Sequence, residues 1–167
     1  MKFFTAFFIC LLGLSGYGQQ LVKDLNTGPK GSNPKEFVFG ATGYTYFIAK
    51  SYNNSYEYQS IWYSYQGGVP ILVSGTEGAR ELVFFQNSLY FITDGDGAYS
   101  LKKLGTSTGS VQFITYIFPQ TGFEYDAHDL VASGDKMYFF SNNSLWVSQG
   151  TEVTTLELSS SVINPQE

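Results

Sequence analysis

The chain has 167 residues and a formal net charge of −5, and 14% of its residues are charged while 18% are aromatic. Disordered chains combine low hydrophobicity with high charge, so this composition excludes an intrinsically disordered protein. The acidic balance, with no basic cluster longer than Lys102-Lys103, also excludes a nucleic-acid partner.

The N-terminus has the layout of a secretory signal peptide. Met1-Lys2 give a short basic start, residues 3–16 are uncharged, and small residues precede a cleavage site before Gln19. The apolar run is shorter than the roughly 20 residues that span a bilayer. The sequence predicts a signal peptide over 1–18 and an exported mature chain without a membrane span, in the periplasm, on the cell surface or outside the cell. The alternative is a retained N-terminal anchor.

The rest of the chain, residues 19–167, shows no helical periodicity. Short runs rich in Val, Ile, Thr, Tyr and Phe alternate with Gly, Asn, Asp and Ser, which is typical of strands joined by turns. The sequence therefore predicts an all-β fold without a helix longer than one turn. We expect strands near 21–25, 36–40, 44–50, 57–65, 69–74, 80–85, 88–93, 98–103, 110–118, 128–132, 136–141, 144–148 and 153–159.

A Tyr-Phe pair recurs three times, in "YTYFIAK", "SLYFITD" and "KMYFFSN". One strand precedes each pair and two follow it, so the repeating unit is four strands in about 46 residues, the size of a β-propeller blade. The sequence predicts one propeller-like domain with three blades, over about 21–75, 76–118 and 119–160. The three repeated pairs are Tyr46-Phe47, Tyr90-Phe91 and Tyr138-Phe139.

The strand after each Tyr-Phe strand carries a second repeated position. Trp62, Leu101 and Trp146 are interpreted as equivalent, and both tryptophans are predicted to pack between blades. The alternative is a platform on which a sugar ring stacks. The glycines of the following turns are expected at positive φ, as hairpins require: Gly67, Gly68, Gly105 and Gly150.

The segment "SLWVSQGT" (144–151) resembles the signature of the ELWxxDGTxxGT repeat proteins, a secreted bacterial family common in Bacteroidetes. The segment "LVKDLNTGPKGSNPKEF" (21–37) resembles the linker between repeats of that family, and "VINPQE" (162–167) resembles the start of another linker. The resemblance implies a propeller-like surface protein and no enzyme class. The chain departs from the family at the Asp of the DGT turn, where Gln66, Leu104 and Gln149 stand instead.

The stretch "YNNSYEYQSIWYSY" (52–65) holds more tyrosines than one blade face buries. Tyrosine offers a large rigid contact area with a polar tip, so Tyr56, Tyr58, Tyr63 and Tyr65 are predicted to contact a protein or glycan ligand. The alternative is that they are ordinary edge-strand aromatics.

Two further segments carry acidic residues. In "TDGDGAY" (93–99), Asp94 and Asp96 alternate with glycines as in a calcium loop, and a hairpin turn is the alternative; no other cofactor is expected. The only histidine, His128, has Glu124, Asp126 and Asp129 nearby. A metal ligand or base is weighed there against ordinary turn and edge residues, and no catalytic residue is nominated.

The function that these patterns favour is an exported, non-enzymatic binding or scaffold module. The alternative is a carbohydrate-binding or carbohydrate-active protein that uses exposed tyrosines. Propellers typically close with four to eight blades, so three blades are expected to need self-association or further repeats. An open stack of blades is the third interpretation.

Overall fold

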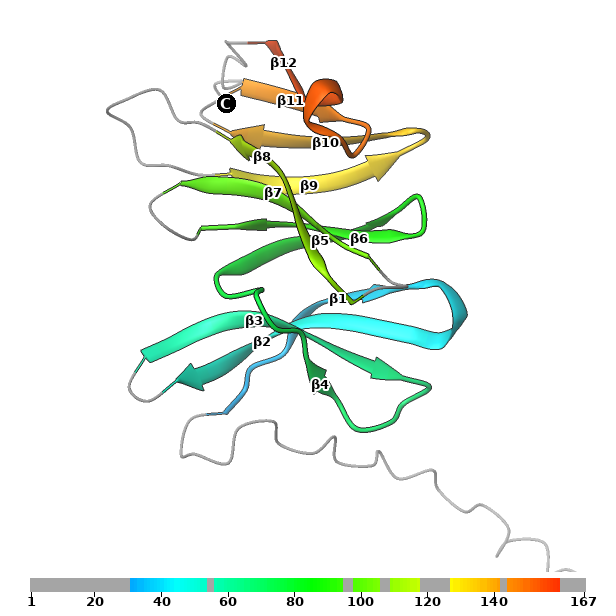
Figure 1. Ribbon diagram of the computed structural model, residues 1–167, viewed down its shortest axis with the longest axis vertical. Helices are drawn as coiled ribbons and strands as arrows, with labels where there is room; N and C mark the ends of the chain where they lie inside the picture. The colour runs from blue at the N-terminus through cyan, green and yellow to red at the C-terminus, as the bar shows by residue number, and fades with distance from the viewer. Residues whose placement is uncertain are drawn as a thin grey trace, which may run out of the picture.

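Three antiparallel sheets of four strands each are stacked along the chain in this computed structural model, which describes residues 31–53, 56–94, 98–105, 109–117, 127–141 and 144–159 (Figure 1). In every sheet, strands that follow one another in sequence are neighbours. We call the sheets blade 1 (β1–β4), blade 2 (β5–β8) and blade 3 (β9–β12). This arrangement confirms the prediction of an all-β, propeller-like fold with three four-stranded blades.

The strands follow the predicted runs closely. Among the described residues, two short 3-10 helices accompany them, η1 (Ala41–Gly43) and η3 (Glu152–Thr154). The strands are β1 (Lys35–Phe39), β2 (Tyr44–Asn53), β3 (Tyr56–Tyr65), β4 (Ile71–Leu72), β5 (Ala79–Phe85), β6 (Ser88–Thr93), β7 (Tyr99–Leu104), β8 (Val111–Ile117), β9 (Ala127–Ser133), β10 (Lys136–Ser141), β11 (Ser144–Ser148) and β12 (Leu156–Ser159).

Two outer strands are shorter than expected, and the strand expected at 21–25 lies outside the described residues. Strand β4 follows Pro70, which has no N–H to donate to a ladder, and it ends before a turn with Gly75 at φ +78°. In blade 3 the η3 turn replaces the first half of the expected strand. The Thr154 N–H donates to the Thr151 carbonyl at 3.2 Å, which closes this turn.

The recurring Tyr-Phe pair has a structural reason, because the two rings point to opposite faces of a strand. Tyr46 and Tyr90 face the next blade along the chain, whereas Phe91 and Phe139 face the previous blade. The middle pair, Tyr90-Phe91, therefore supplies one ring to each of the two interfaces, while each outer pair supplies one ring to a single interface. All four rings are at most 4% exposed.

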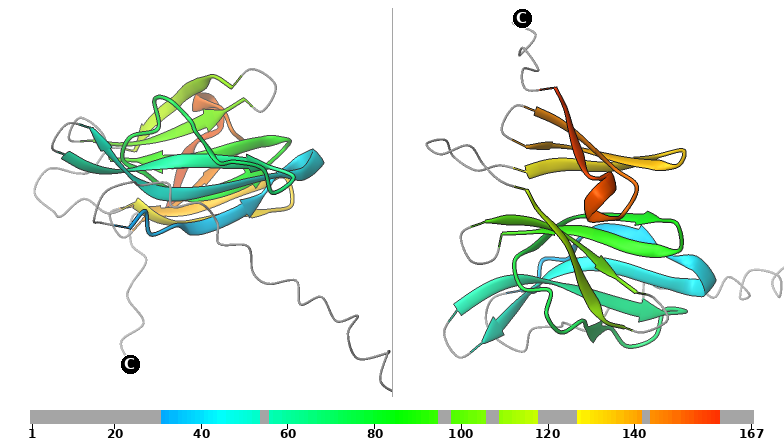
Figure 2. Two further views of the ribbon diagram at one scale, coloured as in Figure 1. Left: turned by 90° about the horizontal axis from the view of Figure 1, so that it is seen from below. Right: turned by 45° about the horizontal axis from the view of Figure 1, so that its top comes forward.

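Two apolar cores hold the three blades together. Blade 2 lies between blades 1 and 3 (Figure 2, right). The first core joins blades 1 and 2, and its buried members are Tyr46, Ile48, Ile61, Val73, Ala79, Leu82, Leu89, Phe91 and Leu104. The second core joins blades 2 and 3, and its buried members are Phe85, Tyr90, Ile92, Leu101, Ile117, Ala127, Leu130, Met137 and Phe139.

The strand register corrects one predicted equivalence. Phe47 pairs with Trp62 and Phe139 pairs with Trp146, but in blade 2 the partner of Phe91 is Lys102. Lys102, not Leu101, is therefore the equivalent of the two tryptophans. A shift of one residue moves a side chain to the other face of a sheet, which is why Leu101 belongs to the second core.

The tryptophans themselves differ. Trp146 packs against the second core, parallel to the ring of Phe139 at 6.0 Å between centroids, as predicted for a residue between blades. Trp62 lies on the face of blade 1 that is turned away from blade 2, because the neighbouring Ile61 faces the first core.

The innermost strands β1, β5 and β9 lie side by side, with β5 between the other two. Each contains a bulge after a paired position, at Lys35, Arg80 and His128. The residue that follows is acidic and has a positive φ in every case: +53° at Glu36, +57° at Glu81 and +57° at Asp129. The positive φ is unfavourable for a residue with a Cβ, so three equivalent cases indicate a shared structural role.

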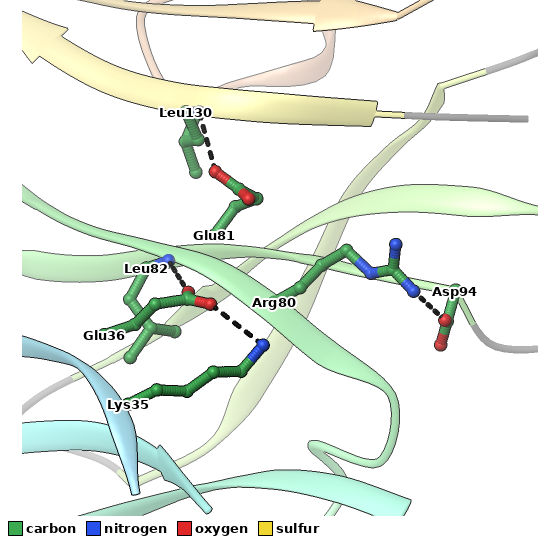
Figure 3. A network of polar contacts seen from close by, with 7 residues as sticks. All are labelled: Lys35, Glu36, Arg80, Glu81, Leu82, Asp94 and Leu130. Carbon is green, nitrogen blue, oxygen red and sulfur yellow. Dashed lines mark hydrogen bonds and ion pairs between the residues drawn. The ribbon is translucent and has the colours of Figure 1, made fainter.

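That role is visible between the blades (Figure 3). The Leu82 N–H of blade 2 donates to Oε2 of Glu36 in blade 1 at 3.3 Å. In the same way, the Leu130 N–H of blade 3 donates to Oε2 of Glu81 in blade 2 at 3.3 Å. The bulge of β5 thus gives a carboxylate to the next blade and receives one at the N–H of its second residue, whereas the bulge of β1 only gives one and the bulge of β9 only receives one. We call this contact the carboxylate link.

The connection between blades 1 and 2 is fixed by Thr76, which is fully buried. Its hydroxyl donates to the Val73 carbonyl at 2.7 Å and accepts from the Ile61 N–H at 3.0 Å.

Within the described residues, no helix has the length and apolar character to cross a bilayer.

Candidate functional site

Four tyrosine rings gather on one face of blade 1, at the end where β2 begins and β3 ends. The pairing of these strands sets Tyr44 opposite Tyr65 and Tyr46 opposite Tyr63. The ring centroids lie 4.9 Å apart for Tyr44 and Tyr65, 5.7 Å for Tyr44 and Tyr63, and 6.1 Å for Tyr46 and Tyr63. These separations are those of favourable aromatic pairs, so the rings form one continuous wall.

Three of these rings line a groove of about 410 Å³ between blades 1 and 2, which we call the tyrosine groove. None of the described residues that line it carries a charge. The groove therefore suits an uncharged ligand that offers a flat apolar face to the rings and polar groups to their hydroxyls. The lining residues are Tyr44, Tyr46, Tyr63, Ile71, Leu72, Val73, Ser74, Leu104, Gly105 and Gly109.

Tyr46 lies deepest in the wall and is 4% exposed. Burial raises the pKa of its hydroxyl above the ordinary value, and the neighbouring Tyr44 and Tyr63 raise it further. Burial disfavours the charged phenolate. The hydroxyl of Tyr46 is therefore neutral at physiological pH and remains so into alkaline solution.

The structure divides the four predicted ligand tyrosines into two pairs. Tyr63 and Tyr65 belong to the tyrosine wall, whereas Tyr56 and Tyr58 lie on the opposite face of β3, because side chains alternate along a regular strand. Tyr65 is 48% exposed and Tyr56 is 81% exposed. The predicted set therefore does not form a single surface.

Sequence reasoning missed Tyr44 altogether and gave Tyr46 only a structural role. The signal was present in the hairpin between β2 and β3, whose two-residue connection joins Asn53 to Tyr56. A two-residue hairpin fixes the register of both strands. Counting back from this connection sets Tyr44 and Tyr46 opposite the tyrosines already identified.

A second, polar pocket of about 280 Å³ is lined by Tyr58 together with Glu57, Gln59, Gly78, Arg80 and Asp94. Its charges are already paired: Arg80 with Asp94 (Figure 3), and Glu57 with Lys50. The predicted calcium ligand Asp94 thus has a cationic partner, while Asp96 lies outside the described residues. Across the described ranges, no group of three or more His, Cys, Asp or Glu residues could hold a metal ion. The calcium site stays a prediction.

His128 and Asp129 both lie in β9, on the inner edge of blade 3. The His128 Nδ1 and the Asp129 Oδ2 are 3.0 Å apart, and the imidazole ring stacks on Phe140 at 5.8 Å. Glu124 and Asp126 lie outside the described residues. Asp129 takes the bulge position that Glu36 and Glu81 take in the other two blades.

Comparisons with known proteins bear on the fold. No protein-family model matches the chain, and no curated protein sequence matches it. Among solved structures, the chain is similar to one described as the crystal structure of the tricorn protease, with a TM-score of 0.57 and 15% identity over 80% of this chain. The chain spans 13% of the length of that protein. At this identity the similarity concerns the fold alone, and together with the three blades it defines the class: a propeller-like, all-β repeat protein.

Proposed function

We propose that the chain is an exported, non-enzymatic module that binds a neutral ligand in the tyrosine groove. The observation that supports this most directly is the wall of Tyr44, Tyr46, Tyr63 and Tyr65, whose rings are within 6.1 Å of a neighbour. Rigid aromatic side chains bind at a low cost in conformational entropy, since they have only two rotatable side-chain bonds.

Two ligand classes fit an uncharged aromatic groove. A peptide with proline or aromatic residues would lay flat apolar rings against the tyrosines. A glycan would place the apolar face of a sugar ring there, and its hydroxyls would contact the tyrosine tips. The glycan is the second candidate function, a carbohydrate-binding protein, and the tyrosine rings support its binding form rather than hydrolysis.

The test is ligand-observed NMR with two libraries, neutral oligosaccharides and uncharged peptides rich in proline and aromatic residues. We expect members of one library to bind the wild type and to lose affinity at least about tenfold in Tyr63→Ala. The matched control is Tyr56→Ala, which removes an 81% exposed ring from the opposite face of the same strand. Circular dichroism shows whether each variant is folded. If Tyr63→Ala is unfolded, Tyr63→Phe takes its place, because it keeps the ring and removes only the hydroxyl.

The outcomes separate the candidates. Oligosaccharide binding that depends on Tyr63 favours the carbohydrate-binding protein, and peptide binding that depends on Tyr63 favours a protein-binding module. The proposal of a groove ligand is wrong if no library member binds, or if Tyr63→Ala and Tyr56→Ala bind equally well.

Export is a separate part of the proposal and rests on residues 1–18 of the sequence. When the whole chain is expressed in a bacterial host, we expect it outside the cytoplasm with Gln19 as its first residue. N-terminal sequencing and cell fractionation measure both properties. A protein that keeps Met1 and stays in the cytoplasm would contradict export, and would also weaken the proposed relationship to the ELWxxDGTxxGT repeat proteins.

A further inference from the structure

The two ends of the blade array carry the two halves of a contact that the chain already makes twice. Glu36 and Glu81 each accept from an N–H in the next blade, at Leu82 and Leu130, with both distances 3.3 Å. The donor half of this carboxylate link is a bulge N–H, and the acceptor half is an acidic residue at positive φ.

Blade 3 carries an acceptor half that no described residue uses in this way. Asp129 has the same bulge position and the same φ as Glu81, +57°. Its side chain is 71% exposed, and its partner among the described residues is the adjacent His128. The backbone thus holds an unfavourable conformation that presents a carboxylate to the outside of the array.

Blade 1 carries the matching donor half. Phe37 takes the position of Leu82 and Leu130, which are 8% and 5% exposed in the two cores. Phe37 is 55% exposed, and the carboxylate links within the described residues go to the N–H groups of Leu82 and Leu130, not to that of Phe37. Its ring stacks at 5.3 Å on Phe47, which is already shielded at 4% exposure. Phe37 is therefore the ring that a further blade would cover.

Blade 3 also exposes apolar side chains on its outer face, the face that is turned away from blade 2. Val131 takes the position of Val38 and Val83, which pack against the two cores, but Val131 itself is 53% exposed. Leu156 on the same face is 56% exposed. Exposed apolar residues that are buried at equivalent positions elsewhere in the chain mark an interaction surface.

We propose that a second copy of this chain binds head to tail, with blade 1 of one copy packed on blade 3 of the other. The partner's identity follows from the complementarity, because the two halves that meet are those that meet at both interfaces within the chain. A second contact of the same kind closes two copies into a ring of six blades, which is within the range of four to eight found in propellers. The inference does not rest on the ligand proposed for the tyrosine groove.

The first experiment is sedimentation and light scattering of the protein purified after expression of the whole chain, over a wide range of concentration. We expect a dimer that dissociates on dilution and shows no larger species. A monomer at the highest soluble concentration would overturn the proposal.

Three variants and one control test which surfaces meet. Phe37→Asp and Val131→Asp place a charge in the contact from either side, and each is expected to weaken dimerisation at least about tenfold. Asp129→Gly removes the carboxylate while glycine accepts the positive φ, so it weakens the dimer without straining the monomer. The control is Phe113→Asp, at a 49% exposed aromatic on the middle blade, which should dimerise as the wild type does.

Mixing distinguishes a head-to-tail contact from one in which identical surfaces meet. A Phe37→Asp copy keeps its blade 3 surface, and a Val131→Asp copy keeps its blade 1 surface. Each variant alone is expected to be monomeric at a concentration at which the mixture forms a one-to-one complex, and this complex is weaker than the wild-type dimer because it has one contact instead of two. A Phe37→Asp or Val131→Asp protein that dimerises as tightly as the wild type, while circular dichroism shows a folded chain, would overturn the proposal.

Discussion

Gly150 shows how closely two blades approach at a single residue. It follows β11 with φ +91°, and a Cβ built on it would lie 2.2 Å from the hydroxyl oxygen of Tyr90 in blade 2. The glycine of the "SLWVSQGT" segment is therefore required for two reasons, the left-handed backbone and the contact between blades.

We predict that Gly150→Ala lowers the free energy of unfolding by roughly 2–5 kcal/mol, the sum of a left-handed alanine and an overpacked core. Gly134 is the matched control, because it has φ +62° with no atom within 4 Å of a built Cβ. Gly134→Ala should cost only the backbone part, about 1–2 kcal/mol. Urea unfolding measures both values, and equal losses would show that Tyr90 does not limit the site.

Two buried hydroxyls near β3 offer a second comparison. The Thr76 hydroxyl makes two hydrogen bonds, while the Ser60 hydroxyl is buried without a partner among the described residues. We expect Thr76→Val to lower the free energy of unfolding by about 1–3 kcal/mol, since it leaves a buried N–H and a carbonyl unpaired. Ser60→Ala should leave stability unchanged or raise it slightly. Thermal unfolding would contradict this account if Ser60→Ala were the more damaging substitution.

The raised pKa of Tyr46 predicts a dependence of stability on pH. Its pKa is higher in the folded protein than the unfolded value of 10.0. The contribution of Tyr46 is thus fully present below pH 10 and is lost as the pH rises through the folded pKa. We expect Tyr46→Phe to reduce the alkaline loss of stability, measured by urea unfolding at neutral and alkaline pH. Tyr56→Phe is the exposed control, and an identical alkaline loss in both variants would be evidence against burial as the cause.

At the scale of the strand, the bulges of β1, β5 and β9 are the feature that joins the blades. The bulge residue Glu81 is only half-buried, but it connects the inner strands of blades 2 and 3 through Leu130. Hydrogen bonds that involve a charged group contribute more than neutral ones.

Glu81→Met keeps the length of the side chain and removes the acceptor. We predict a loss of about 1.5–3 kcal/mol in the free energy of unfolding and faster hydrogen exchange at the Leu130 amide. Glu77→Met changes an exposed glutamate in the nearby turn and should affect neither quantity. NMR-detected exchange reports the amide, and an unchanged rate at Leu130 in Glu81→Met would exclude the carboxylate link as a stabilising contact.

The strands could be predicted from the sequence, but their register and bulges could not. In "YSLKKL" the apolar Leu101 looks like the counterpart of the tryptophans, yet pairing gives that position to Lys102. The bulges were not foreseen because glutamate is not expected at positive φ. The tyrosine groove was half predicted, since Tyr63 lies in a tyrosine-rich stretch while Tyr44 joins it only through strand pairing.

At the scale of the whole molecule, the middle blade differs from its neighbours because it packs on both faces. Blade 2 contributes to both cores, whereas blades 1 and 3 each contribute to one. In an array of repeats, stability is approximately a sum over repeats and the interfaces between neighbours. Blade 2 should therefore be the most stable part of the monomer.

Hydrogen exchange followed by mass spectrometry tests this order. We expect the slowest amides in β6 and β7, around Phe91, Ile92 and Leu101, which are fully buried, and earlier exchange in blades 1 and 3. Uniform protection in the dilute monomer would mean that the blades unfold as one unit.

The tyrosine groove has one wall on blade 1 and one on blade 2, so a ligand bound there must hold the less stable blade against the more stable one. Such a ligand should slow exchange in β2 and β3 more than in blade 3, because binding stabilises only the states in which both walls are folded.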